Sequence, residues 1–292
     1  MQTQFARACA LSLGLAACTA ISQNRAGAAE STDWLSKTIS PVVNPILFES
    51  PFIDSEVRPI FLTQKMPGNF ITGGGNVRVY AVQLRYAITD RLALIATKDG
   101  FIEFNPSGMA HQDGWANLAG GLKYAIIDDR ENDFILTPGV TFEFPTGNQR
   151  VFQGEGSGIW NLFVSAGKGF GNFHLTGNLG FEIPFDFSAN TSQFHYSLQA
   201  DYYTCQYFIP FVALNGYTVM SEGDALPLGT EGYDLINFGS SNAQGWNGVV
   251  LGTGFRSRLL KWADLGFGYE YAVANPKGIF SSRFTVDFIV RF

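Results

Sequence analysis

Apolar and polar side chains alternate along the last nine residues of the chain, residues 284–292. Every even position, from Phe284 to Phe292, carries a large apolar side chain, whereas Thr285, Asp287 and Arg291 occupy odd positions. Successive side chains of a β-strand point to opposite faces, so this segment is predicted to form a strand with one apolar and one polar face. A half-buried strand of a soluble protein shows the same alternation, so other features must decide what the apolar face meets.

Segments of about ten residues with the same alternation recur throughout residues 56–292. Short connections between them alternate with longer ones, which is typical of a transmembrane β-barrel with tight periplasmic turns and larger outer loops. The sequence therefore predicts an all-β fold, a closed antiparallel transmembrane barrel of about twelve strands. Its opening strand is expected at residues 56–64 and its closing strand at 279–292, with hairpins between them at 78–97, 115–144, 158–184, 194–218 and 248–273.

Composition favours the membrane over water as the surroundings of this barrel. Aromatic residues make up 15% of the chain, and charged residues also make up only 15%. Soluble domains carry about 25% charged residues, so too few charges remain here to cover a soluble surface. A lipid-facing apolar band flanked by aromatic girdles accounts for both values.

The first 28 residues are predicted to be a cleaved secretory signal peptide. Residues 8–20 are small and apolar, and Ala26, Gly27 and Ala28 form a small-x-small cleavage site. The apolar run is too short to cross a bilayer as a helix. Residues 15–18 also fit a lipoprotein box, in which Cys18 would be lipidated, and this alternative stays open. Either signal sends the chain to the cell envelope, and the barrel pattern places it in the outer membrane of a Gram-negative-type envelope.

An irregular leader is expected between the signal and the barrel, at residues 29–55. Pro41, Pro45 and Pro51 interrupt any long helix or strand in it. The preferred interpretation is a periplasmic leader before the first strand. A small plug inside the barrel is the alternative.

Thirteen polar and charged residues are predicted to line the inside of the barrel, because they alternate with the apolar positions. Cations and anions are interleaved among them, so they could line a passage with a weak mixed field or satisfy one another in a closed polar core. The pore-lining candidates are Arg85, Lys123, Glu143, His174, Glu182, His195, Gln199, Asp201, Arg256, Asp264, Glu270, Asp287 and Arg291.

Two segments are expected to form long outer loops. Residues 99–114 are rich in glycine, proline and asparagine, which favour turns. Residues 219–245 form the longest connection and carry four acidic residues. This second loop could fold over the mouth of the barrel, or it could be a passive solvated loop.

No motif of the sequence predicts covalent chemistry or a cofactor. His195 and Ser197 form a His-x-Ser pair, but the alternation turns both inward, whereas a hydrolase of membrane lipid needs them at the lipid face. The three histidines and three cysteines show no metal-ligand spacing. The formal net charge of −6 offers nothing that attracts nucleic acid. We therefore expect no catalytic residue, no metal and no other cofactor.

Several motifs resemble the family of outer-membrane transporters named after the meta pathway of phenol degradation. They are the segments 86–94 (YAITDRLAL), 120–124 (GGLKY) and 142–147 (FEFPTG), together with the closing strand, and the resemblance covers roughly residues 56–292. It implies a barrel fold and the uptake of aromatic hydrocarbons, and it identifies no ligand residue. The terminal Phe292 resembles the aromatic signal that the barrel assembly machinery reads at the end of outer-membrane barrels.

The predicted function is an outer-membrane channel or facilitated-diffusion transporter for small solutes, with apolar or aromatic ones favoured. Its expected partners are outer-membrane lipid, the assembly machinery and the solute. Two alternatives are kept: a closed barrel with a structural or assembly role in the outer membrane, and a barrel lipid hydrolase.

Overall fold

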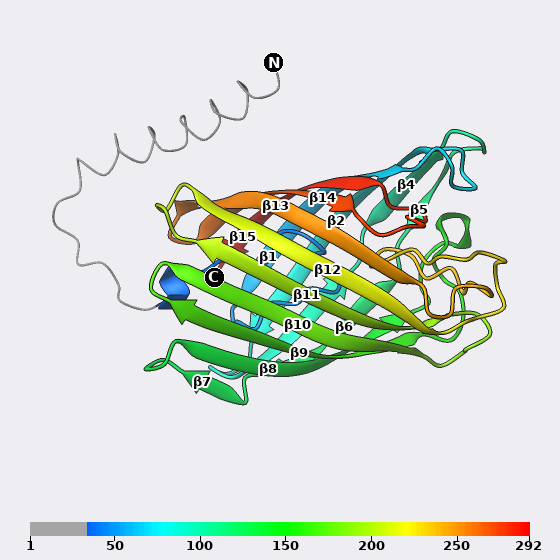
Figure 1. Ribbon diagram of the computed structural model, residues 1–292. Helices are drawn as coiled ribbons and strands as arrows, with labels where there is room; N and C mark the ends of the chain where they lie inside the picture. Colours follow the sequence, from blue (N-terminus) through cyan, green and yellow to red (C-terminus); the bar gives the residue numbers. More distant parts are fainter. Residues whose placement is uncertain (1–33) are drawn as a thin grey trace, which may run out of the picture.

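The computed structural model describes residues 34–292, and Figure 1 shows their arrangement. The expected signal peptide at residues 1–28 and the alternative site at Cys18 lie outside the described residues. The extended elements are β1 (Glu56–Met66), β2 (Gly75–Ala87), β3 (Leu92–Lys98), β4 (Phe101–Pro106), β5 (Gln112–Trp115), β6 (Leu118–Tyr124), β7 (Ile127–Asp129), β8 (Phe134–Phe144), β9 (Ile159–Phe170), β10 (Phe173–Pro184), β11 (Ser192–Tyr202), β12 (Ile209–Ser221), β13 (Asn247–Leu260), β14 (Ala263–Ala272) and β15 (Ser282–Arg291).

All of these strands belong to one antiparallel sheet that closes on itself. β1 pairs with β2 on one side and with β15 on the other, which joins the two ends of the sheet. β3 and β4 follow each other along β2 and make one strand of the wall, β5 and β6 make another, and β7 is a short addition beside β8. The wall therefore has twelve strands, as the sequence predicts.

Side-chain burial follows the alternation that predicted the strands. On β2, Gln83 and Arg85 are buried inside, whereas Leu84 and Tyr86 are about half exposed on the outside. The outer surface carries large apolar side chains on nearly every wall strand, which suits lipid and not water. The fold is therefore a transmembrane β-barrel.

The helical elements are two short 3-10 turns, η1 (Trp34–Ser36) and η2 (Gln149–Val151). Within residues 34–292, none of the helices has the length and apolar character needed to cross a membrane.

The two ends of the barrel differ in their connections. At the inner end, where η1 and Phe292 lie, most turns are short, such as the Gly171–Asn172 turn between β9 and β10. At the outer end the connections 145–158 and 222–246 are long (Figure 1). This asymmetry orients the barrel with its inner end toward the periplasm.

One predicted outer loop is wrong. Residues 99–114 are largely strand, because the wall continues through β4 and β5 after a break at Asp99 and Gly100. Gly100 has a φ of 106°, which favours glycine, and the Asp99 side chain accepts a hydrogen bond from the backbone N–H of Val82. Glycine here marks an irregularity within a strand and not its end. The connecting turn at the outer end is only residues 107–111.

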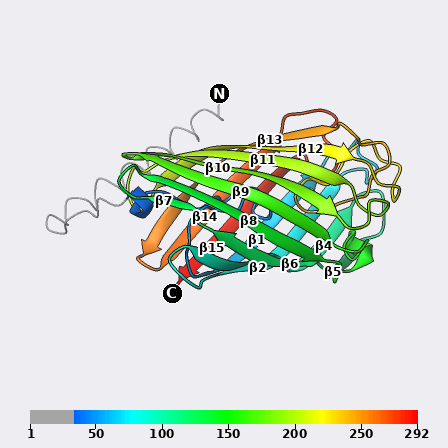
Figure 2. The same ribbon diagram turned by 90° about the horizontal axis from the view of Figure 1, so that it is seen from below.

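The N-terminal segment lies inside the barrel, so the preferred interpretation of a periplasmic leader is wrong for it. Residues 34–55, which we call the plug, lie between the strands of the wall (Figure 2). They begin at the inner end, where the Trp34 ring lies beside His174, turn at Asn44, and end again at the inner end with Ser55, whose carbonyl accepts the N–H of Phe292. Asn44 has a φ of 49° and its carbonyl accepts the N–H of Phe48, which closes the turn. The structure matches the plug alternative.

The long connection 222–246, which we call the mouth loop, folds into the outer end of the barrel. Tyr233, Leu235, Ile236 and Phe238 are buried in the largest hydrophobic cluster together with wall residues of β1, β2 and β12. Of the two interpretations left open for this loop, the one that folds over the mouth is correct.

Candidate functional site

The plug is held at its centre by a buried carboxylate between two wall cations. Arg85 donates from Nε and Nη2 to the two oxygens of Glu49, at 2.9 and 2.6 Å, and Lys123 Nζ lies 2.7 Å from Oε1. Burial on its own raises the pKa of Glu49, but the two cations bring this pKa down from 4.5 to about 2. Glu49 is therefore ionised at neutral pH, and it fixes the plug to β2 and β6.

A second anchor holds the part of the plug that precedes its turn at Asn44. Asp287 accepts from both terminal nitrogens of Arg256 at 2.8 Å and from Arg58 Nε at 2.7 Å. Arg58 also donates to the backbone carbonyl of Pro41 at 2.6 Å. All three charged side chains are buried, and β1, β13 and β15 hold them in place. The Pro41 carbonyl adds one more acceptor to this buried network.

The tip of the plug makes neutral hydrogen bonds to the wall. Asn44 Nδ2 donates to Ser197 Oγ at 3.0 Å, and Gln83 donates to the carbonyl of Pro45 at 2.7 Å. In each of these bonds, as in the charged ones, at least one of the two partners is a side chain. The plug adds no strand to the sheet.

Glycines of the wall make room for the plug. A methyl group on Gly268 would lie 2.8 Å from Val43 Cγ1, and one on Gly252 would lie 3.1 Å from Val43 Cγ2. At the inner end, a methyl group on Gly169 would lie 3.0 Å from the ring of Trp34. Larger side chains at these inward positions would occupy the space of the plug.

One wall arginine connects the plug tip to the mouth loop. Arg283 on β15 donates from two nitrogens to Asp234 of the mouth loop, at 2.8 and 2.6 Å, and lies 3.7 Å from Glu270. The backbone amide of Asn44 interacts with the same Glu270 carboxylate. The plug and the mouth loop therefore both contact one buried charge cluster, formed by Arg283, Asp234 and Glu270.

The mouth loop also contains an internal anchor of its own. Glu231 accepts the backbone N–H groups of Gly232, Phe238 and Ser240 at 3.1, 2.7 and 2.8 Å. Burial raises the pKa of Glu231, and these donors lower it in part. The carboxylate thus fixes the loop to itself and not to the wall.

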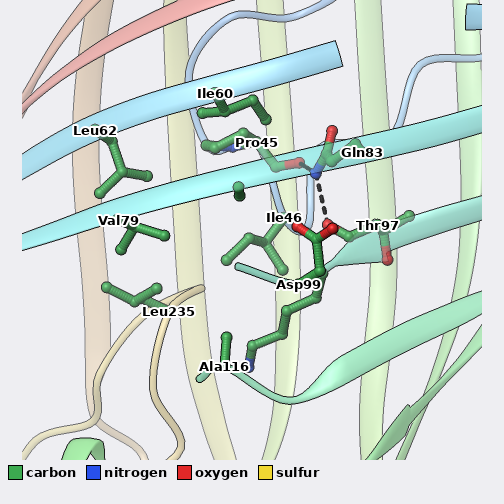
Figure 3. Close-up of a pocket in the computed structure, with 12 residues that line it drawn as sticks. Pro45, Ile46, Ile60, Leu62, Val79, Gln83, Thr97, Asp99, Ala116 and Leu235 are labelled. Atoms are coloured by element: carbon green, nitrogen blue, oxygen red, sulfur yellow. Dashed lines mark hydrogen bonds between the residues drawn. The ribbon is translucent and has the colours of Figure 1, made fainter. Parts of the chain in front are cut away.

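A narrow cavity remains where the plug tip faces the mouth loop. Figure 3 shows Pro45 and Ile46 of the plug opposite Leu235 of the mouth loop, with Ile60, Leu62 and Val79 of the wall around the space. Its volume is about 20 Å³, room for about one water molecule. Most lining side chains are apolar, and Gln83, Thr97, Lys98 and Asp99 supply polar groups at its edge.

Eleven of the thirteen pore-lining candidates are buried inside the barrel, and their role in a passage stays a prediction. Glu143 and Arg291 are partly exposed. The plug anchors bring together Arg85 with Lys123 and Arg256 with Asp287, and the charge cluster contains Glu270. The remaining buried candidates are His174, Glu182, His195, Gln199, Asp201 and Asp264.

Several candidates form separate contacts away from the plug anchors. His174 Nδ1 and Asp201 Oδ1 are 2.7 Å apart near the inner end, and Arg291 donates to Asp264 at 2.8 Å. Glu143 pairs with Lys98 at 2.7 Å at a break of the wall. These pairs satisfy charges within the wall and do not meet in one catalytic cluster.

The His-x-Ser pair lies inside the lumen. His195 and Ser197 are buried on the inner face of β11, away from the lipid surface. His195 Nε2 is 2.9 Å from Asn161 Oδ1, and the Ser197 hydroxyl is bonded to the plug. The inward orientation predicted from the alternation is correct. Among residues 34–292, no group of three or more His, Cys, Asp and Glu side chains is placed to hold a metal ion.

Sequence reasoning missed several residues that hold the lumen closed. Glu49 and Asp234 lie in irregular segments, where no period shows which way a side chain points. Arg58 and Arg283 could have been found, because each lies on an inward position of a predicted strand. Extending the alternation of the closing strand by two residues from Thr285 places Arg283 inside.

The fold resembles that of known outer-membrane barrels, although the sequence identities are 14% or lower. Neither the models of known protein families nor the curated proteins match this chain. The COG4313 outer membrane channel from Pseudomonas putida F1 is 14% identical with a TM-score of 0.58, covering 87% of this chain and 100% of that one. The NanC porin is 9% identical with a TM-score of 0.51, covering 82% and 99%.

The β domain of the Bordetella autotransporter BrkA is similarly close. It is 12% identical with a TM-score of 0.51, covering 82% of this chain and 100% of that one. At these identities the likeness shows the fold, that of an outer-membrane β-barrel. Because channels and an autotransporter share this fold, the function of the chain has to be argued from its lumen.

Proposed function

We propose that the chain is an outer-membrane channel for small solutes that the plug holds shut. The observation that carries this proposal is the way the lumen is filled. A smaller barrel, of about eight strands, can fill its inside with wall side chains. Here the inward wall positions Gly169, Gly252 and Gly268 leave space, and a separable segment occupies it.

The bonds that seat the plug support its release as a unit. They run from a few wall side chains to Glu49, Asn44 and backbone carbonyls, and no β-ladder joins the plug to the wall. The plug can leave these partners while the ladders between neighbouring strands keep their hydrogen bonds. Water entering the lumen would then solvate Arg85, Lys123 and the other inward charges, which would line the passage.

The cavity at the plug tip supports a preference for apolar or aromatic solutes. Ile46, Ile60, Leu62, Val79 and Leu235 offer apolar surface where the plug meets the mouth loop. The resemblance of residues 86–94, 120–124 and 142–147 to transporters of the phenol meta-pathway family agrees with such a solute. At about 20 Å³, the cavity admits a solute only when the plug or the mouth loop moves.

No enzymatic step is part of this proposal. A lipid hydrolase would need a nucleophile at the lipid surface, and Ser197 is bonded to the plug inside the barrel. Outer-membrane lipid surrounds the wall in this proposal, and the assembly machinery reads Phe292, whose side chain is 73% exposed at the inner end.

Ion conductance across planar lipid bilayers tests the proposal. Glu49→Ala leaves Arg85 and Lys123 without their shared carboxylate in the seated state, which costs about 3 kcal/mol or more. We expect the variant to conduct in long openings, and the wild type to conduct rarely. Glu131→Ala, which removes a carboxylate from an exposed turn, is the matched control and should behave like the wild type. A Glu49→Ala barrel that folds but stays silent would favour the structural alternative.

A further inference from the structure

A second cavity lies on the outer rim of the barrel, between the β1–β2 connection and the β14–β15 connection. It measures about 770 Å³ and opens to solvent. The nine residues around it include two lysines and no acidic residue: Lys65, Met66, Pro67, Gly68, Asn69, Asn275, Pro276, Lys277 and Ser281. The lining residues carry two ammonium groups, two side-chain amides and a hydroxyl, a set of donors that suits an anion with several oxygens.

Lys65 points outward from the wall, and Lys277, in the β14–β15 connection, contacts the outward-facing Tyr271. Lys65 is exposed on β1, opposite Ser282 of β15, which in turn lies opposite Tyr271 of β14. Lys277 Nζ donates to the Tyr271 hydroxyl at 2.8 Å and lies 4.0 Å from the centre of that ring. Because neighbouring strands place opposite Cβ atoms about 5 Å apart, the two ammonium groups share one short row of the outer rim.

An apolar surface begins directly beneath these cations. Phe284 and Tyr269, two residues further along β15 and β14, are 41% and 49% exposed on the outside. Elsewhere on the rim, aromatic side chains such as Trp160 and Phe185 take the outward positions. This sector joins a cationic cavity to the lipid-facing belt, so it suits an amphiphile with an anionic head and apolar chains.

The turn that carries Lys277 is fixed before any ligand binds. Trp246 Nε1 donates to the carbonyl of Pro276 at 2.9 Å, and the Tyr233 hydroxyl donates to the carbonyl of Lys277 at 2.8 Å. Both donors belong to the folded mouth-loop cluster. A preformed site loses less entropy on binding than a mobile loop does.

We propose that this rim cavity binds a phosphate group of a glycolipid in the outer leaflet, with Lys65 and Lys277 as its cations and the acyl chains along Phe284 and Tyr269. The proposal rests on the outer-membrane placement of the barrel but not on conduction. It therefore survives if the barrel proves to be silent.

Native mass spectrometry of the full barrel in neutral detergent, titrated with bisphosphorylated lipid A, tests this site. We expect the wild type to bind this lipid at least tenfold more tightly than lipid A without its phosphates, and Lys65→Gln/Lys277→Gln to lose that preference. Lys261→Gln, the same charge change at an exposed turn of the inner end, is the matched control and should keep it.

The outcomes separate the possible sources of binding. Equal affinity of the wild type for both lipids, or an equal loss in Lys261→Gln, would overturn the site. Binding of inorganic phosphate as tight as that of the lipid would overturn the glycolipid as its ligand. Heat-dependent gel migration of the double variant shows whether the barrel is folded, and Lys277→Arg, which keeps the charge, should retain the preference.

Discussion

The plug and the mouth loop fill the same lumen from opposite ends, but they are held by different forces. The plug is anchored by charges and carbonyls that meet wall side chains, chiefly Glu49 with Arg85 and Lys123, and its apolar residues form two smaller clusters with the wall. The mouth loop lies in the largest hydrophobic cluster, which it shares with the wall, and Glu231 binds its backbone internally. The mouth loop keeps its shape through these internal bonds and the largest cluster, whereas the plug keeps its place through a few buried polar anchors. We therefore expect the plug to be the segment that moves.

The largest effect should follow from removing the aromatic centre of the mouth loop. The Tyr233 ring lies 5.2 Å from Tyr217, 5.1 Å from Trp246 and 5.0 Å from Phe280. Tyr233→Ala should lower the free energy of unfolding by about 3–5 kcal/mol, measured by urea denaturation in detergent micelles. Tyr86→Ala on the lipid face is the control, with a much smaller loss. A similar loss in both variants would show that this aromatic cluster does not hold the mouth loop in the barrel.

A smaller effect should follow from crowding the plug without touching a charge. In Gly268→Ala the new methyl group would lie 2.8 Å from Val43, which should destabilise the seated plug by about 1–3 kcal/mol. Conductance of single barrels should show longer openings than in the wild type. Gly177→Ala is the control, since its methyl group would have its nearest neighbour at 3.6 Å. Unchanged openings in Gly268→Ala would mean that the wall glycines do not seat the plug.

A further effect is the acid response of the plug, which depends on the Glu49 carboxylate. The pKa of Glu49 is about 2 when the plug is seated and 4.5 in its ordinary surroundings. Its charge therefore stabilises the seated state fully above pH 4.5, and this stabilisation is lost as the pH falls through about 2. Conductance should stay low from neutral pH to about pH 4.5 and rise toward pH 2. Glu49→Gln should remove this dependence, and an equal acid response in that variant would assign it to other groups.

The sequence predicted the wall far better than the contents of the lumen, for a physical reason. Alternation along a strand fixes which side chains of β2 or β15 face inward, so the pattern alone is enough to place Arg85, Asp287 and Glu270 inside the barrel. Residues 34–55 and 222–246 have no period, and their positions depend on partners distant in sequence. The break at Asp99 and Gly100 misled the prediction because glycine marks both turns and irregular strands.

A reversible cross-link between the plug and the wall tests whether the barrel conducts only when the plug leaves its seat. Asn44 Nδ2 and Ser197 Oγ are 3.0 Å apart, so cysteines at these two positions are close enough for a short bis-methanethiosulfonate reagent to join the plug tip to β11 through reducible disulfides. In a Glu49→Ala background, the cross-linked Asn44→Cys/Ser197→Cys barrel should be closed, and reduction should open it. The single variant Asn44→Cys should show no redox response. Equal conductance before and after reduction, with the cross-link verified by mass, would contradict the account.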